Sequence, residues 1–520
     1  MALVYPVAWL VLWVAAELAG LLLGRRLALF RSAGVRCVYW ALRPLGVAAV
    51  LHLVYRLNPE QAFTNVLGYP YYARPWQAEF SPFALLAEAV RSPVIRFWSL
   101  TSVVVFLAIF ALAVFAMRGG CRTRGRRAGF LGLLFLLTVA LHLALACVPG
   151  GASRPMERFD SFLRPWFNSG ATFLYALEHV DTPRRFMRNF VARQPALRRS
   201  MSGLSHPPGG TLSLYAIGQV MRVEGVRRHD RLKYAVGVTL FSALNVFAVY
   251  FLAASVFGSA RTGCLAACFW SCLPLSTLYN TWAQNGVFLV FFTLALGLMW
   301  TAVVPERRSP WSLLLLGVVF HFLTLLTYAW MIATAIFAVF VVAHGWRRGR
   351  GLREIAWRGV PPLAVMTVLT GATLAVYRLD YLAMYRNASY YVSLFYRIEG
   401  ATAWFMGLAG GQLALFLGLG PLLLSAFFAA LWVAGRSGRG WGDRELFLAS
   451  MAGIYLLPMF FYHRLNIEAP RVWNWMAMLP LVFAVHHLAE ERRRPALVGI
   501  ALACTFAASF LMKLFYDFAP

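Results

Sequence analysis

The chain has 520 residues, 60% hydrophobic and 13% charged, and its basic residues outnumber its acidic ones by 28. Repeated apolar runs of about 17 to 25 residues are each long enough to cross a bilayer as a helix. This composition excludes a set of water-soluble domains and predicts an all-α polytopic transmembrane bundle of about 12 to 14 spans. The basic excess does not indicate nucleic acid as a partner, because basic residues clustered in short loops between spans are the positive-inside signal.

The N-terminus has the pattern of a first membrane span. Met1 to Gly20 lacks a basic first region and leads directly into Gly24-Arg25-Arg26, so no cleavable signal peptide is expected. Lys233 and Lys513 are the only lysines, and such a preference for arginine is typical of a GC-rich bacterial coding sequence. We therefore expect an integral multi-pass protein of a bacterial inner membrane.

The arginine clusters predict a topology. We assign to the cytoplasm the clusters at 25–43, 118–127, 222–233, 347–358, 436–444 and 492–494. Spans are then expected near 5–23, 44–56, 99–117 and 129–148. They place the loop 149–206 outside, after which 207–222 returns inward and 234–257 leads out again.

The next segment, 264–281, is interrupted by Pro274. If it were a full crossing, the spans expected at 285–304, 311–328 and 329–345 would leave Trp346 outside, against the arginines that follow. We therefore expect 264–281 to be re-entrant or interfacial. Because irregular backbone at membrane depth is tolerated only inside protein or along a wet cavity, this segment is a candidate wall of a site.

Later spans complete the predicted bundle and leave two further loops outside, at 378–402 and 463–473. The spans are expected near 359–377, 408–434, 446–462, 473–488 and 496–513. The tyrosine-rich first loop is interpreted as an interfacial aromatic belt. We divide the chain into an additional N-terminal transmembrane region (1–117), a catalytic transmembrane core (118–490), and a last transmembrane helix and tail (491–520).

The outer loop 149–206 carries most of the clustered polar chemistry. Asp160 lies between Arg158 and Arg164, whose charges would keep its carboxylate ionised while it accepts a proton from a hydroxyl. Glu157 competes for the same role. The alternative is that Asp160 forms a helix cap or a salt bridge. We predict Asp160 and Glu157 as catalytic candidates, with both arginines binding substrate.

Two further outer segments supply candidate binding residues. His206 precedes Pro207 and Pro208, which fix the start of a helix and hold a side chain suited to a phosphate or a sugar hydroxyl. Arg471 is suited to two parallel hydrogen bonds with a phosphate, unless it pairs only with Glu468.

No metal site is predicted. The cysteines at 264, 268 and 272 have helical spacing but no histidine or acid beside them, so we interpret them as small packing residues.

In the order of these segments the chain resembles the GT-C membrane glycosyltransferases, which include protein O-mannosyltransferases and bacterial aminoarabinose transferases. The resemblance covers roughly residues 129 to 490 and rests on Asp160, His206-Pro207-Pro208-Gly209, Gln284-Asn285 before an apolar helix, and Glu468, Arg471 and Pro480.

It implies an inverting transfer from a polyprenyl-phosphate sugar to an extracytoplasmic lipid, glycan or protein. Asp160 would be the base, Arg471 a phosphate ligand, and Gln284 and Asn285 would bind substrate. The implied partners are the lipid-linked donor, the acceptor and membrane lipids. No cofactor is implied beyond, at most, a divalent cation.

Two other functions compete with this interpretation. A surface-polysaccharide ligase or polymerase, acting on lipid-diphosphate-linked glycans, would gather basic residues in one large outer loop, as 149–206 does with six arginines at 184, 185, 188, 193, 198 and 199. A lipid or sugar transporter would show inverted repeats, and the sequence shows no convincing internal repeat.

Overall fold

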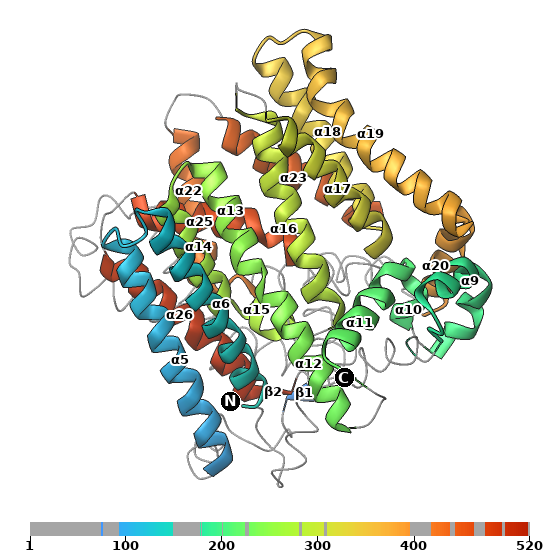
Figure 1. Cartoon of the computed structure of the whole chain (residues 1–520). Helices are drawn as coiled ribbons and strands as arrows, with labels where there is room; N and C mark the ends of the chain where they lie inside the picture. The colour runs from blue at the N-terminus through green and yellow to red at the C-terminus, as the bar shows by residue number, and fades with distance from the viewer. Residues whose placement is uncertain are drawn as a thin grey trace, which may run out of the picture.

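The fold is helical, as the composition predicts. The computed structural model describes residues 74–75, 93–148, 177, 179–199, 201–223, 228–279, 283–305, 309–395, 418–436, 442–461, 474–490 and 495–517. Within these residues the only strands are a two-residue antiparallel pair, β1 (Arg74–Pro75) and β2 (Tyr516–Asp517). All other regular structure is helix (Figure 1), which confirms the all-α prediction.

Six helices in the described part of the chain are long and apolar enough to cross a membrane. Five are continuous: α5 (Pro93–Met117), α6 (Arg124–Ala146), α16 (Ala283–Val303), α18 (Trp330–Arg347) and α19 (Leu352–Tyr377). The sixth joins α12 (Arg228–Ala243) to α13 (Asn245–Phe257) as a span over Lys233–Phe257. Large apolar side chains are exposed along α5 and α19, a surface suited to lipid and unsuited to water. This is the architecture that a multi-pass membrane protein requires.

Shorter helices complete the bundle. They are α14 (Ala260–Cys272), α15 (Pro274–Tyr279), α17 (Pro310–Leu326), α22 (Pro421–Arg436), α23 (Asp443–Phe461), η5 (Asn474–Ala477), α25 (Met478–Glu490) and α26 (Pro495–Phe515). The core surrounds α14, which is buried from Thr262 to Cys272. At its edges Phe106 of α5 stacks on Phe506 of α26, and Phe292 of α16 stacks on Trp475 of η5. One continuous hydrophobic core therefore joins helices from both ends of the chain.

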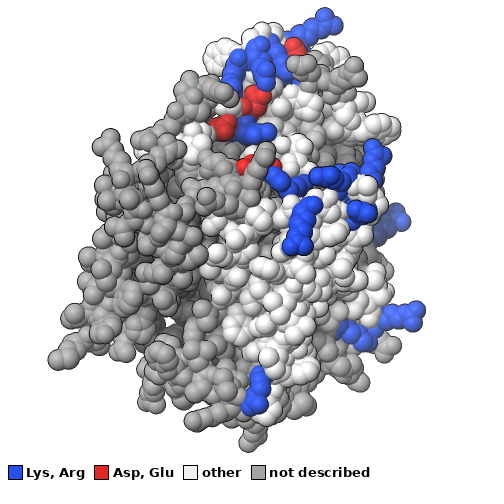
Figure 2. All heavy atoms as spheres, turned by 90° about the vertical axis from the view of Figure 1, so that its left-hand side faces the viewer, with Lys and Arg blue, Asp and Glu red and all other residues white. Residues whose placement is uncertain are grey.

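One end of the bundle, which we call the arginine-rich end, is held by ion pairs between helix termini. Asp443 binds Arg347 and Arg348, and Arg261 binds Glu490 at 2.7 Å. Buried Arg358 donates to the carbonyl oxygen of Pro305 at 3.1 Å. Figure 2 shows most of the basic side chains on its face gathered in the upper part, above a broad surface with few charged side chains.

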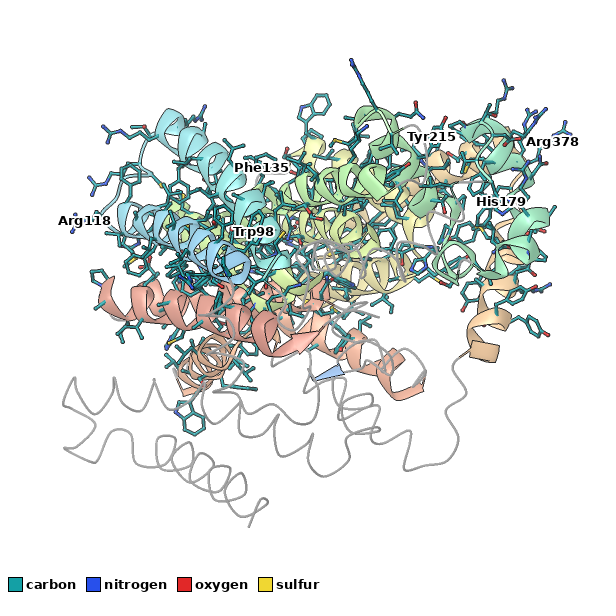
Figure 3. The ribbon with its side chains drawn as sticks, turned by 90° about the horizontal axis from the view of Figure 1, so that it is seen from below. Trp98, Arg118, Phe135, His179, Tyr215 and Arg378 are labelled. Carbon is teal, nitrogen blue, oxygen red and sulfur yellow. The ribbon has the colours of Figure 1, made fainter. Side chains whose placement is uncertain are left out.

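The opposite end, which we call the cap end, carries a layer of short helices. They are α9 (Pro183–Arg193), η3 (Gln194–Arg199), α10 (Met201–Ser205), α11 (Pro208–Val220) and α20 (Tyr381–Phe395). A separate hydrophobic cluster joins them, with Phe186, Phe190 and Met384 fully or nearly fully buried. Seen from below, His179, Tyr215 and Arg378 lie together on one side, away from Arg118 (Figure 3).

The return crossing predicted at 207–222 is wrong. Helix α11 has 13 residues, which span about 20 Å against a hydrocarbon core of about 30 Å. After it, Tyr234 of α12 packs with Ala146 and Cys147, at the end of α6 that is opposite to Arg124. The cluster at 222–233 therefore lies at the cap end, not beside the cluster at 118–127 (Figure 1). Two prolines and paired glycines begin this helix, but its apolar stretch is too short to cross.

The segment 264–281, predicted to be re-entrant or interfacial, forms two helices that are broken at Pro274. Cys264 contacts Cys121 near the arginine-rich end, whereas Ser271 contacts His142 further along α6 and Leu275 packs against Gly418. Helices α14 and α15, broken at Pro274, thus run the length of the bundle. The start of α16 lies at the cap end.

Candidate functional site

His206 is the one predicted site residue whose side chain the structure describes. It lies between α10 and α11, where Pro207 is the N-cap and Pro208 the first residue of α11, which confirms the predicted helix start. The Ser205 hydroxyl is hydrogen-bonded to Nδ1 of His206 at 3.0 Å. The imidazole ring stacks on Phe288, with ring centres 5.5 Å apart and planes 27° apart. These contacts fix the ring at the inner face of the cap end.

Phe288 belongs to the first turns of α16. Gln284 and Asn285 lie in the opening turn of the same helix, about one turn before Phe288; their side chains lie outside the described residues. The contact between His206 and Phe288 therefore joins two segments that are separated by about 80 residues of chain. Both segments were predicted as parts of one site, and the structure brings them together.

The position of His206 depends on a close approach between backbones. A β-carbon added to Gly209 would lie 2.4 Å from the carbonyl oxygen of Leu325, at the end of α17. The hydroxyl of Ser213 donates to the Gly209 carbonyl at 2.7 Å, closing the first turn of α11. Only glycine permits this contact, so the start of α11 is packed directly against α17.

The remaining predicted site residues, Asp160, Glu157, Arg158, Arg164, Glu468 and Arg471, lie outside the described residues. Their flanking residues are described. Cys147 and Val148, which precede the first group, are buried at the cap end. Asn474 and Trp475, which follow the second group, are buried too, and Trp475 stacks on Phe292 one turn beyond Phe288. The chain therefore enters the first segment at the cap end of α6 and leaves the second segment beside α16.

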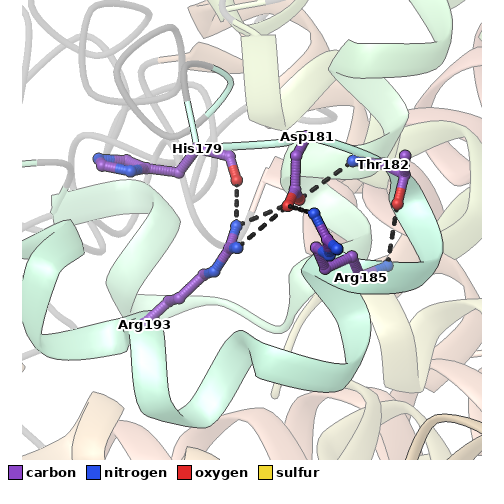
Figure 4. Close-up of polar contacts among 5 residues, drawn as sticks. All are labelled: His179, Asp181, Thr182, Arg185 and Arg193. Atoms are coloured by element: carbon purple, nitrogen blue, oxygen red, sulfur yellow. Dashed lines mark hydrogen bonds and ion pairs between the residues drawn. The ribbon is translucent and has the colours of Figure 1, made fainter.

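Asp181, a further acidic residue of the outer loop, is held by its neighbours (Figure 4). Its carboxylate accepts hydrogen bonds from Arg193 at 3.2 Å, from Arg185 at 3.4 Å and from the amide of Thr182 at 3.0 Å. Arg193 also donates to the carbonyl of His179. Thr182 caps α9 by accepting from the amide of Arg185. This set of contacts closes the turn before α9, and we interpret Asp181 as structural.

The ion pairs of Asp181 predict a pH dependence. Partial desolvation raises the pKa of this carboxyl, but the hydrogen bonds from Arg193, Thr182 and Arg185 outweigh it and hold the pKa below the usual value. Because the folded pKa is depressed, the stabilisation is present above about pH 3.9 and is lost as pH falls through the folded value. Asp181→Asn should remove this loss of stability at acidic pH. Hydrogen exchange of the amides of α9, measured at falling pH in both proteins, checks it; an identical profile would contradict it.

Gln194 joins the outer loop to α20, and sequence reasoning missed it. The side chain is fully buried. Its amide nitrogen donates to the carbonyls of Leu204 at 3.3 Å and Met384 at 3.2 Å, and its oxygen accepts from Asn387 at 3.1 Å. A single glutamine beside a run of arginines carries no signal of burial, since two of its three partners, Met384 and Asn387, lie 190 and 193 positions away.

Replacing Gln194 by leucine should detach α20 from the outer loop. The near-isosteric side chain removes one hydrogen bond from each of three polar groups, at a cost of about 1–3 kcal/mol for each group that is left buried and unsatisfied. Thermal unfolding of the purified protein and hydrogen exchange of α20 measure the effect. Gln219→Leu, at an exposed position of α11, is the matched control. Equal behaviour of the two variants would show that the Gln194 contacts do not hold the cap together.

An aromatic group fills the junction of α17, α18 and α20. The indole of Trp330 donates to the hydroxyl of Tyr381 at 2.7 Å, which in turn donates to the carbonyl of Thr324 at 3.0 Å. Tyr328 packs edge-on against Tyr381 and Tyr385. Burial raises the pKa of Tyr328 and Tyr381 well above the usual value, so both phenols stay neutral. Part of the predicted aromatic belt is therefore internal to the cap.

The described part of the cap end combines a fixed imidazole, neutral phenols and exposed guanidiniums. Such groups bind hydroxyls and phosphate through hydrogen bonds and charge. Within the described residues, no cluster of three or more histidine, cysteine, aspartate or glutamate side chains is arranged to hold a metal ion. Comparison with protein-family models and with curated protein sequences finds no match to the chain.

Proposed function

We propose that the protein is a membrane glycosyltransferase that moves a sugar from a polyprenyl-phosphate donor to an extracytoplasmic acceptor. The observation that carries the proposal is the stacking of His206 on Phe288. It joins the proline-initiated helix and the start of α16, two separate elements of the GT-C resemblance. It does so at the end of the bundle from which the outer loop departs.

The orientation follows from the short loops. The arginine-rich end carries its basic residues in short connections, such as 118–123 and 348–351, which are the loops that set membrane orientation. The cap end also carries basic residues, in the loop 149–206 and in the cluster at 222–233, but short basic connections are more numerous at the arginine-rich end. The arginine-rich end is therefore assigned to the cytoplasm of a bacterial inner membrane and the cap end to the outside. That side suits a lipid-linked donor, because nucleotide sugars are cytoplasmic.

The proposed reaction is a single displacement. The acceptor hydroxyl transfers its proton to Asp160 as its oxygen attacks the anomeric carbon, with Glu157 as the alternative base. The bond from the anomeric carbon to the phosphate oxygen breaks, and the polyprenyl phosphate leaves with the bonding electrons, which inverts the configuration. Arg471, oriented by Glu468, neutralises the leaving phosphate, while Arg158 and Arg164 keep Asp160 ionised.

The remaining candidates position the sugar. His206 is held from two sides, by Ser205 and by Phe288, so that its ring presents a hydrogen-bonding nitrogen in one orientation. Gln284 and Asn285, one turn before Phe288, are assigned to sugar hydroxyls. Holding the donor within a few tenths of an ångström of its reactive geometry provides a large share of the rate acceleration in an enzyme of this kind.

The test is transfer of labelled sugar by the purified protein from a panel of synthetic donors. We expect transfer from polyprenyl-monophosphate sugars, with an inverted product. Transfer only from lipid-diphosphate-linked oligosaccharides would instead assign the protein to the polysaccharide ligases or polymerases. If neither donor class supports transfer but sealed vesicles carrying the protein accumulate sugar or lipid, the protein is a transporter and the proposal fails.

A further inference from the structure

A buried polar cluster lies inside the bundle, apart from His206. It is formed by α6, α14 and α26. Its members are Thr138, His142, Ser271, Ser509 and Lys513, each no more than 6% exposed. Ionisable side chains within membrane helices cost about 2.5–3.5 kcal/mol or more at the centre of a span, and they usually mark a site of function. A lysine and a histidine in one such cluster therefore mark it as a candidate site.

The histidine is fixed in one orientation. Its Nε2 lies 3.0 Å from the backbone carbonyl oxygen of Ser271. Because a carbonyl only accepts, Nε2 must carry a proton and donate it. The hydroxyl of Ser271 is held in turn by Thr138 at 2.6 Å. Among the described residues, the Nδ1 atom of His142 has no hydrogen-bond partner although it is buried. This nitrogen is therefore the ring atom whose hydrogen-bonding capacity is unused among the described residues.

The lysine places a positive charge beside this ring. Lys513 lies in the last turn of α26, and its ammonium group interacts electrostatically with His142 and with Cys147. Cys147 ends α6 at the cap end. One turn before the lysine, Ser509 donates to the carbonyl of Cys272 at 2.6 Å, which ties α26 to α14. The lysine therefore lies near the ends of α6 and α14.

We propose that Lys513 and His142 form an anion site within the membrane that binds the phosphate of a polyprenyl phosphate. A phosphate oxygen accepts from the ammonium group, and a second accepts from Nδ1 when the ring is protonated, which the negative charge itself favours. A lipid phosphate fits better than free phosphate because the site lies between apolar helices. The hydrocarbon chain of a lipid can lie in the bilayer beside these helices, whereas a free phosphate ion would have to leave water to reach the site. The choice of lipid rests on the proposed function; the anion site does not.

The lysine can be tested with a control supplied by the chain itself. The sequence contains two lysines, and Lys233 lies outside the cluster, donating to the carbonyl of Arg222 at 3.1 Å. Binding of polyprenyl phosphate to the purified protein is measured for wild type, Lys513→Met, Lys513→Arg, His142→Gln and Lys233→Met. We expect Lys513→Met to raise the dissociation constant by at least about tenfold. Lys513→Arg should recover part of the affinity, and Lys233→Met should leave it unchanged. Unchanged binding by a folded Lys513→Met overturns the proposal.

A second measurement needs no variant. An amine-reactive reagent is applied to the wild-type protein, and modification of each lysine is followed by mass spectrometry. Polyprenyl phosphate at ten times its dissociation constant should slow modification of Lys513 about tenfold and leave Lys233 unaffected. Protection by inorganic phosphate instead would identify a site for the free anion and overturn the lipid assignment. Absence of protection by both would overturn the anion site. Protection of Lys513 by polyprenyl phosphate in a protein that transfers no sugar would support the anion site and contradict the proposed function.

Discussion

Asp160→Asn is expected to lower sugar transfer by about 10²- to 10⁴-fold, the contribution typical of a positioned general base. The amide keeps the shape of the carboxylate but cannot accept the acceptor's proton. Donor binding should change little, because the phosphate contacts are assigned to other residues. Initial rates with a polyprenyl-monophosphate sugar, together with donor affinity, measure both effects.

Asp181→Asn is the matched control for this experiment. It makes the same change in the same outer loop, at a carboxylate whose partners are Arg185, Arg193 and Thr182. We expect it to keep the wild-type rate. If Asp160→Asn also kept the wild-type rate, Asp160 would be structural, and Glu157→Gln would decide whether the neighbouring acid is the base.

Gly209→Ala is expected to damage both stability and transfer. The new methyl group would lie 2.4 Å from the carbonyl oxygen of Leu325, and a backbone oxygen cannot rotate away as a side chain can. Overpacking of this kind costs about 1–3 kcal/mol. Because α11 carries His206 against Phe288, moving its start by about 1 Å should lower transfer by up to about 10²-fold. Thermal unfolding and initial rates are the measurements.

Gly371→Ala provides the comparison for this substitution. A β-carbon at Gly371, in the middle of α19, meets no atom within 4 Å. There alanine should stabilise the helix by about 0.5–1 kcal/mol and leave transfer unchanged. Gly209→Ala with the same gain in stability and full transfer would show that α11 tolerates displacement, and that the contact with α17 does not position the histidine.

The candidate site was predictable from sequence where local chemistry decides structure. Pro207 and Pro208 predict a helix start because proline has no amide hydrogen to lose there, and the structure has α11 beginning at Pro208. The direction of the chain was not predictable in the same way. Whether α11 and the broken segment α14–α15 run across the bundle depends on short or interrupted apolar runs, whose course is decided by packing against neighbouring helices.

By itself, the sequence determined the helical class and the positions of the long spans, because a run of apolar residues must satisfy its backbone within itself in lipid. The tertiary structure alone decided which distant residues meet. Phe288 lies against His206, Gln194 reaches Met384, and Lys513 lies near His142, each pair far apart in the chain. These contacts follow from the packing of whole helices, whose crossing and depth are set by many side chains together. The local sequence around each of these residues does not predict its partner.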